Sequence, residues 1–125
     1  MAFDPSRPIY RQIISGYLKK MIRGDLRRGD KIPSQREYAE IAKVNPNTVQ
    51  RAYREMEQQD IVETVRGQGT FVKISDQSLE RSKTEMAREY VRHYLLEMRE
   101  LGFDDQEIIS RLVSEITAEG GKPRD

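Results

Sequence analysis

A run of amide, hydroxyl and guanidinium side chains lies between residues 47 and 54. It comprises Asn47, Thr48, Gln50, Arg51 and Arg54, and no carboxylate follows until Glu55. Such groups match the edges of base pairs, because glutamine pairs bidentately with adenine and arginine with guanine, each contact worth roughly 1–3 kcal/mol of discrimination. Solvated helix surfaces usually mix Glu with Lys, so the run indicates a surface that contacts bases and phosphates. The alternative is an exposed polar face without a partner.

Apolar residues at spacings of three and four place this run on one side of a helix. The buried side consists of Val49, Ala52, Tyr53 and Met56. Asn45 is a good N-cap, and Pro46 suits the first helical position. We therefore predict a helix over about residues 46–59, with its polar side turned outward.

Two helices and two strands are predicted around this helix. A first helix of about four turns follows Pro8, and a short second helix begins at a capping box from Ser34 to Glu37 and ends near Lys43. Its apolar face is expected to hold Tyr38, Ile41 and Ala42. Residues 61–66 and 70–74 are rich in β-branched and aromatic side chains, and Gly67-Gln68-Gly69 between them predicts a hairpin.

These elements predict a mainly α fold with a small β-hairpin. The order of three helices and a hairpin is that of a winged helix-turn-helix domain, which we assign to residues 1–75. Residues 76–125 are predicted to form a two-helix C-terminal dimerisation region, with a polar junction at residues 75–78. A second capping box, Asp104 to Glu107, starts the final helix.

Composition excludes several classes of protein. The 125 residues include no cysteine and a single histidine, His93, so disulfides, thiolate metal sites and histidine clusters are excluded. We expect no metal, no cofactor and no enzymatic activity, because the sequence offers neither a glycine-rich phosphate loop nor a nucleophile beside a base. No apolar run approaches the ~20 residues that span a bilayer, and the N-terminus lacks a signal-peptide pattern. A cytoplasmic protein without membrane contact is expected.

The charge is divided unevenly along the chain. Residues 1–73 hold 14 Lys and Arg against 9 Asp and Glu, whereas residues 74–125 hold 8 against 12. A basic first part favours a polyanion, and an acidic second part favours contacts with protein.

Four blocks in the first part have a distinctive order and spacing. They are PIYRQI at 8–13, GDKIPSQRE at 29–37, VNPNTVQRAY at 44–53 and RGQGTFV at 66–72. Over about residues 8–73 the chain thereby resembles the GntR family of bacterial transcriptional regulators. The short helical remainder is similar to the family's YtrA-like subfamily, because it is too small for the effector domains of other members.

The resemblance implies which residues meet double-stranded DNA. Ser34 and Arg36 are expected to position a phosphate at the start of the second helix. Asn47, Thr48, Gln50 and Arg51 are expected in the major groove, and Arg66 at the wing tip, 66–70, near the minor groove with Gly67 and Gly69. The two glycines also have a simpler explanation, since a tight turn alone can require them. Many members carry arginine at positions 46 and 50, so Pro46 and Gln50 imply a different or weaker base preference.

A sequence-specific DNA-binding transcriptional regulator follows from this resemblance. We expect a repressor that binds an inverted-repeat operator as a homodimer. The alternative is a winged-helix module that binds protein and not DNA; it predicts an apolar or acidic outward face on the third helix.

An apolar stripe in the C-terminal part is the expected dimerisation surface. It consists of Met86, Tyr90, Tyr94 and Met98, and it is wide for a lone helix to bury. The alternative is packing within one chain, against the final helix and the DNA-binding domain. Tyr90 and Tyr94 also suggest an effector pocket between subunits, although two helices leave little room for one. A small-molecule effector is thus possible but unidentified.

Overall fold

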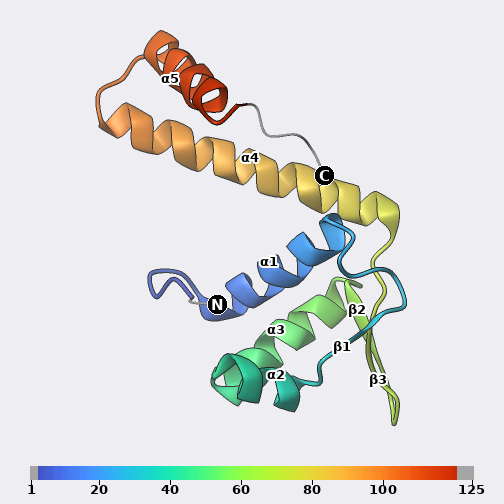
Figure 1. The fold of residues 1–125 in the computed structure, drawn as a ribbon. Coiled ribbons are helices and arrows are strands. Elements are labelled where there is room, and N and C mark those ends of the chain that lie inside the picture. The colour runs from blue at the N-terminus through green and yellow to red at the C-terminus, as the bar shows by residue number, and fades with distance from the viewer. Residues whose placement is uncertain (1–2, 121–125) are drawn as a thin grey trace. The chain divides into compact units, whose positions relative to one another are not determined.

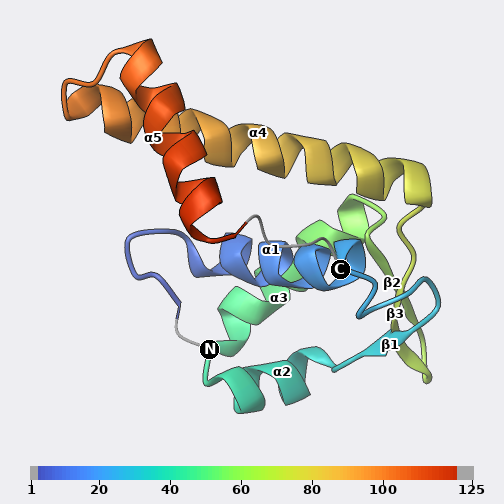
Figure 2. The same cartoon turned by 45° about the horizontal axis from the view of Figure 1, so that its top comes forward.

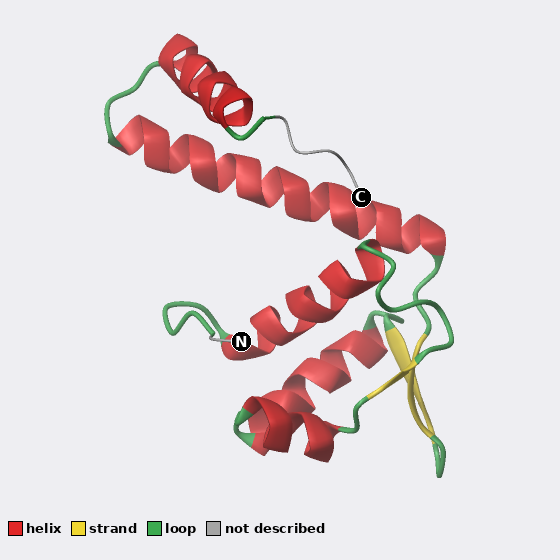
Figure 3. Ribbon diagram, viewed as in Figure 1, coloured by secondary structure: helices red, strands yellow, loops and turns green. Residues whose placement is uncertain are grey.

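The computed structural model describes residues 3–120. Along them lie α1 (Ile9–Ile22), β1 (Lys31–Ile32), α2 (Gln35–Ala42), α3 (Pro46–Gln58), β2 (Val62–Val65), β3 (Gly69–Val72), α4 (Asp76–Glu100) and α5 (Asp105–Ala118) (Figures 1 and 3). The expected fold class, mainly helical with a small β-structure, is confirmed. The chain forms two compact units, residues 1–83 and 84–125, and α4 runs from the first into the second.

Helices α1 and α3 pack together as the core of the first unit (Figure 1). On α3 the predicted apolar side is confirmed, because Val49, Ala52, Tyr53 and Met56 are completely buried. The facing side of α1 buries Ile13, Ile14, Tyr17, Leu18 and Met21. Each such side chain contributes about 1.5–3 kcal/mol, which fixes α3 with its polar side outward.

A chain of hydroxyl groups crosses this core. The Tyr53 hydroxyl donates to the Pro33 carbonyl at 2.6 Å and lies 2.8 Å from the Tyr17 hydroxyl. Because a hydroxyl has one proton, Tyr17 must be the donor to Tyr53. The ring of Tyr38 lies beside both, with centroids 5.7 and 6.3 Å away. This chain joins α1 to α3 and to Pro33, which precedes the N-cap of α2.

The sheet has three strands in the order β1-β3-β2, all antiparallel. The predicted hairpin is present as β2 and β3, paired from Val62 with Val72 to Val65 with Gly69. The third strand was not predicted: Lys31 pairs with Phe71, and Ile32 with Thr70. Two residues give no alternation to detect, and their partners lie far along the chain. Figure 2 shows β1 beside the hairpin.

Helix α2 begins at the predicted capping box. The Ser34 hydroxyl accepts from the Glu37 amide at 3.1 Å, and the Glu37 carboxylate accepts from the Ser34 amide at 2.9 Å. The expected apolar face was wrong at one position, because Ile41 is 76% exposed and Ala39 is buried instead. Helix α2 packs on α3 through the side that holds Ala39, and Ile41 lies outside that contact.

The polar segment 75–78, expected as a junction, starts α4. The Ser75 hydroxyl accepts from the Ser78 amide at 3.1 Å, and the helix begins at Asp76. Such a hydroxyl contact satisfies a free amide of the first turn, which explains why this polar segment is helical.

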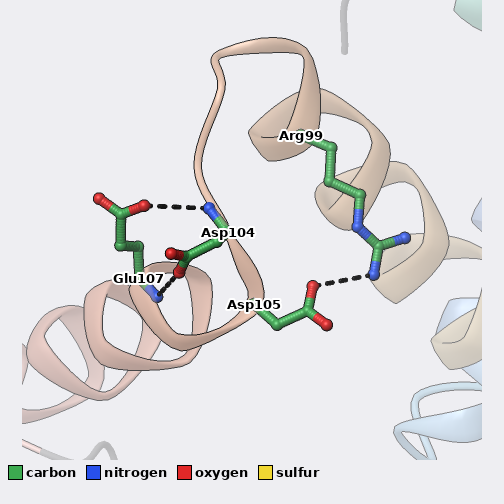
Figure 4. A network of polar contacts seen from close by, with 4 residues as sticks. All are labelled: Arg99, Asp104, Asp105 and Glu107. Carbon is green, nitrogen blue, oxygen red and sulfur yellow. Dashed lines mark hydrogen bonds and ion pairs between the residues drawn. The ribbon is translucent and has the colours of Figure 1, made fainter.

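The second unit consists of the rest of α4 and of α5. The predicted capping box is present, with the Asp104 carboxylate accepting from the Glu107 amide at 2.9 Å and Glu107 accepting from the Asp104 amide at 3.0 Å. Arg99 of α4 lies 3.3 Å from Asp105 (Figure 4). The Tyr94 hydroxyl donates to the Ile108 carbonyl at 3.3 Å. Among the described residues of this unit Ile108 alone is buried.

Candidate nucleic-acid interface

The polar side of α3 is open to solvent. Asn47, Gln50, Arg51 and Arg54 are exposed, and Thr48 is half-buried. Asn45 caps the helix, because its side-chain oxygen accepts from the Asn47 amide at 2.8 Å. All five side chains therefore project from a helix whose start and inner side are both fixed.

A groove between α2 and α3 joins two of the predicted contact regions. Its volume is about 560 Å³, and Arg36, Asn47 and Gln50 are among its lining residues. Polar groups from the starts of two helices thus share one concave surface. Such a surface can follow the convex backbone of a duplex and place amide groups toward its bases.

The Arg51 guanidinium lies on the ring of Tyr10, at the start of α1. Its central carbon is 3.9 Å from the ring centroid. A cation stacked on an aromatic face is stabilised by the ring quadrupole, while the edge of the guanidinium keeps its donors free. Sequence reasoning missed Tyr10 as a functional residue, because no local pattern connects residues 10 and 51. The available signal was an aromatic residue within the PIYRQI block, at the start of the predicted first helix.

The capping box at the start of α2 leaves part of the predicted phosphate site open. Its capping box already occupies the amides of Ser34 and Glu37. The amides of Gln35 and Arg36 have no acceptor within the described part of the chain. The hydrogen bond from the Ser34 amide holds the pKa of Glu37 below its usual value, so the carboxylate stays ionised beside the helix N-terminus. Two amides, the proton of the Ser34 hydroxyl and the Arg36 side chain are available to hold a phosphate.

Arg36 is free to turn toward an anion. Its Nε lies 3.7 Å from Glu40, and the two side chains are 90% and 74% exposed. Exposed pairs of this kind contribute little, about 0–1 kcal/mol, so a phosphate can displace Glu40.

The two glycines of the wing tip have backbone reasons for being glycine. Gly67 has a φ of 78° and Gly69 a φ of 127°, which L side chains rarely adopt. A Cβ at Gly69 would also lie 2.6 Å from Cε of Lys31. The side chain of Lys31 therefore lies across Gly69, close to the turn that holds the exposed Arg66. The turn requires these glycines, and the lysine adds a cation beside the wing.

Side-chain hydrogen bonds connect the wing to α3. The Thr64 hydroxyl of β2 donates to the Glu57 carboxylate of α3 at 2.9 Å and lies 3.1 Å from the Thr70 hydroxyl of β3. Because Thr64 uses its proton for Glu57, Thr70 is the donor to Thr64. The backbone adds a bond from the Ile61 amide to the Met56 carbonyl at 2.8 Å. The wing and α3 are thus held in one arrangement.

The predicted C-terminal stripe is only partly covered in a single chain. Met86, Tyr94 and Met98 are half-buried, and Tyr90 is 52% exposed. The apolar side of α5 is also open, at Ile109, Leu112, Val113 and Ile116. Two adjacent helices therefore expose large apolar side chains.

Neither a membrane segment nor a metal site was found in residues 3–120. No helix there is long and apolar enough to cross a bilayer, and no three His, Cys, Asp or Glu side chains gather as metal ligands.

Comparison with known proteins gives consistent matches. The family model described as "Bacterial regulatory proteins, gntR family" matches residues 9–72. The HTH-type transcriptional regulator YhcF of Bacillus subtilis is 44% identical over 107 residues, which cover 86% of this chain and 88% of YhcF. The HTH-type transcriptional repressor YtrA of the same organism is 38% identical over 127 residues, covering 98% and 97%.

A solved structure extends the match to the fold. A GntR family transcriptional regulator from Listeria monocytogenes superimposes with a TM-score of 0.77 at 36% identity, covering 90% of this chain and 98% of that one. The winged helix-turn-helix order and the exposed polar side of α3 agree with that match. The chain therefore belongs to the GntR family of bacterial regulatory proteins, with YtrA-like relatives, and is a DNA-binding transcriptional regulator and not an enzyme.

Proposed function

We propose that the chain is a repressor that binds an inverted-repeat operator as a homodimer in the bacterial cytoplasm. Helix α3 lies in the major groove, where Asn47, Thr48, Gln50 and Arg51 contact bases or phosphates. Ser34 and Arg36 position a phosphate, and the tip of the wing, with Arg66, Gly67 and Gly69, meets the minor groove. The observation that carries this proposal is the exposed side of α3, which has no carboxylate from Pro46 through Arg54.

Two features support the placement of α3. The groove it shares with α2 is lined by Arg36, Asn47 and Gln50, so phosphate and base contacts adjoin each other. Arg51 is held by its stack on Tyr10, which reduces the loss of side-chain entropy when it pairs with a guanine.

The exposed apolar side chains of α4 and α5 support a homodimer. Contiguous apolar surface on a soluble protein indicates an interaction site, and the stripe of Met86, Tyr90, Tyr94 and Met98 adjoins such surface. One winged helix-turn-helix domain contacts few base pairs. A two-fold dimer brings a second such domain to a half-site about one helical turn away. The operator is accordingly an inverted repeat.

Repression is the regulatory sense we favour, since the similar YtrA of Bacillus subtilis is named a repressor. A dimer bound over a promoter blocks polymerase by occupancy alone. The alternative function, a winged-helix module that binds protein, fits the exposed side of α3 less well, because that side is neither apolar nor acidic.

Selection of bound sequences from a random DNA pool tests the proposal directly. The expected product is a two-fold symmetric site with a constant half-site spacing. Arg51→Ala is expected to weaken operator binding by roughly 5- to 150-fold per half-site, which corresponds to the loss of one bidentate contact between arginine and a base. Arg23→Ala removes the same charge from an exposed position beside Asp25 and is the matched control.

Three results would contradict the proposal. A pool that yields no enriched sequence argues against specific DNA binding. An enriched site without two-fold symmetry argues against the dimer. Equal operator affinities of Arg51→Ala and Arg23→Ala remove Arg51 from the base-reading residues.

A further inference from the structure

A second groove of the first unit lies between α1 and α2, and the DNA-binding proposal does not use it. Both helices pack on α3 (Figure 2). The groove between them has a volume of about 470 Å³. Small-molecule sites usually occupy roughly 300–1,000 Å³. The walls are apolar and aromatic and include Ile13, Tyr17, Tyr38 and Ile41.

Gly16 keeps this groove open, although the fold does not require a glycine at this position. It lies in the middle of α1 with no positive φ, and a Cβ built on it meets no atom within 4 Å. Glycine in a helix interior costs about 0.5–1 kcal/mol relative to alanine. Neither backbone conformation nor close packing offsets that cost here. A bound molecule that occupies the space above Gly16 would offset the cost of the glycine.

Ile41 points to the same space. It is 76% exposed on α2, although its type and helical spacing favour burial. It lines the groove together with the half-buried Tyr38. An apolar ligand would cover Ile41 and both aromatic walls.

Two lysines give the groove its charge. Lys20 of α1 and Lys43 after α2 line it, and no Asp or Glu does so. Neither lysine has an ion pair within the described residues. Lys43 also adopts the left-handed conformation, with a φ of 55°, which costs a residue with a side chain roughly 1–2 kcal/mol. Lys43 is the C-cap of α2, where glycine or asparagine would adopt this conformation at lower cost.

We propose that this groove binds a small amphipathic carboxylate, an apolar acid whose tail covers Gly16 and Ile41 and whose carboxylate meets Lys20 and Lys43. The complementarity is of two kinds, apolar walls for the tail and two lysines of the lining for the carboxylate. The site is separate from the DNA-facing groove, because α2 lines the two with different residues. The proposal therefore does not depend on DNA binding.

Titration of the full chain with octanoate, followed by amide NMR, tests the site. Octanoate is expected to shift the amide signals of Gly16, Ile41 and Lys43 in a saturable manner. Octan-1-ol, with the same tail and no charge, is expected to bind more weakly. Lys43→Gly relieves the left-handed backbone and removes the ammonium, so it is expected to fold at least as well and to raise the Kd for octanoate by roughly two- to fivefold.

Gly16→Leu is the decisive variant. It fills the groove from a helical position that tolerates leucine, and it is expected to raise the Kd at least tenfold. Gly16→Ala removes the glycine without filling the space and is expected to retain most of the affinity. Lys83→Ala, on α4, controls for loss of charge.

Any of three results overturns the proposal. In the first, Gly16→Leu binds octanoate as well as the parent does. In the second, octan-1-ol and octanoate bind equally. In the third, the shifted signals lie on α5, at Ile109 and Leu112, and not around the groove.

Discussion

Replacing Tyr10 with leucine removes the surface on which Arg51 rests. The guanidinium carbon lies 3.9 Å from the Tyr10 ring centroid, within the range of an effective cation–π contact, and such a contact contributes about 0.5–1 kcal/mol at an exposed site. Without the ring, Arg51 must be ordered by the DNA itself. We therefore expect Tyr10→Leu to weaken operator binding by roughly two- to fivefold per winged helix-turn-helix domain.

A double-mutant cycle in a fluorescence anisotropy titration measures this coupling. The parent, Tyr10→Leu, Arg51→Ala and the double variant are titrated against the selected operator. Tyr10→Leu is expected to have no effect on affinity once Arg51 is absent, so that the coupling energy is about 0.5–1 kcal/mol. Tyr10→Phe keeps the ring and loses only the hydroxyl that accepts from Arg11 Nε at 3.0 Å, and it should bind like the parent.

Two outcomes would refute the reasoning. If Tyr10→Leu weakens binding equally in the presence and absence of Arg51, Tyr10 acts through the fold and not through the stack. If Tyr10→Leu binds more tightly than the parent, the stack holds Arg51 away from DNA. Urea denaturation of each variant separates these results from plain destabilisation, because only 9% of Tyr10 is exposed.

Tyr53→Phe is expected to lower the free energy of unfolding by about 2 kcal/mol and Tyr17→Phe by about 1 kcal/mol in urea denaturation, since Tyr53 makes two hydrogen bonds and Tyr17 one; equal losses would contradict the view that Tyr53 stabilises the core through both bonds. Burial raises the pKa of Tyr17 to about 12, whereas the unfolded chain loses this proton near pH 10. Stability should therefore fall as the pH rises above about 10, and melting curves should show a steeper fall for the parent than for Tyr17→Phe. Thr64→Val is expected to destabilise the protein by about 1–3 kcal/mol because it leaves the buried Thr70 hydroxyl without its acceptor; Thr64→Ser should restore stability in the same denaturation assay.

The helices could be predicted from the sequence because their signals are local. The spacing of Val49, Ala52, Tyr53 and Met56 identified the buried side of α3, and all four are buried. Both capping boxes were found from four consecutive residues each, and both form the expected hydrogen bonds. Once the inner side of α3 is known, its outer side follows, so the polar run from Asn47 to Arg54 could be placed on the surface.

The features that the sequence did not predict depend on contacts between distant residues. Strand β1 is two residues long and exists because β3 offers it a partner. The stack of Arg51 on Tyr10 and the hydroxyl chain through Tyr53 each join separate helices. Ile41 was expected on the buried face of α2 from its type and its spacing from Tyr38, but it is 76% exposed and lies outside the contact between α2 and α3. Packing between helices and strands decides all of these features, and the spacing of residues within one element does not reveal that packing.

The hydrogen bonds that join Thr64 to Glu57 and Thr70 fix the position of the hairpin relative to α3. In the proposed complex, α3 in the major groove and the wing tip in the minor groove are therefore held at a fixed separation. Adjustment to local variation in groove width falls to the duplex, whose pyrimidine–purine steps bend at least cost. A domain of fixed shape would discriminate among operators by how easily their DNA deforms at base pairs that no side chain contacts.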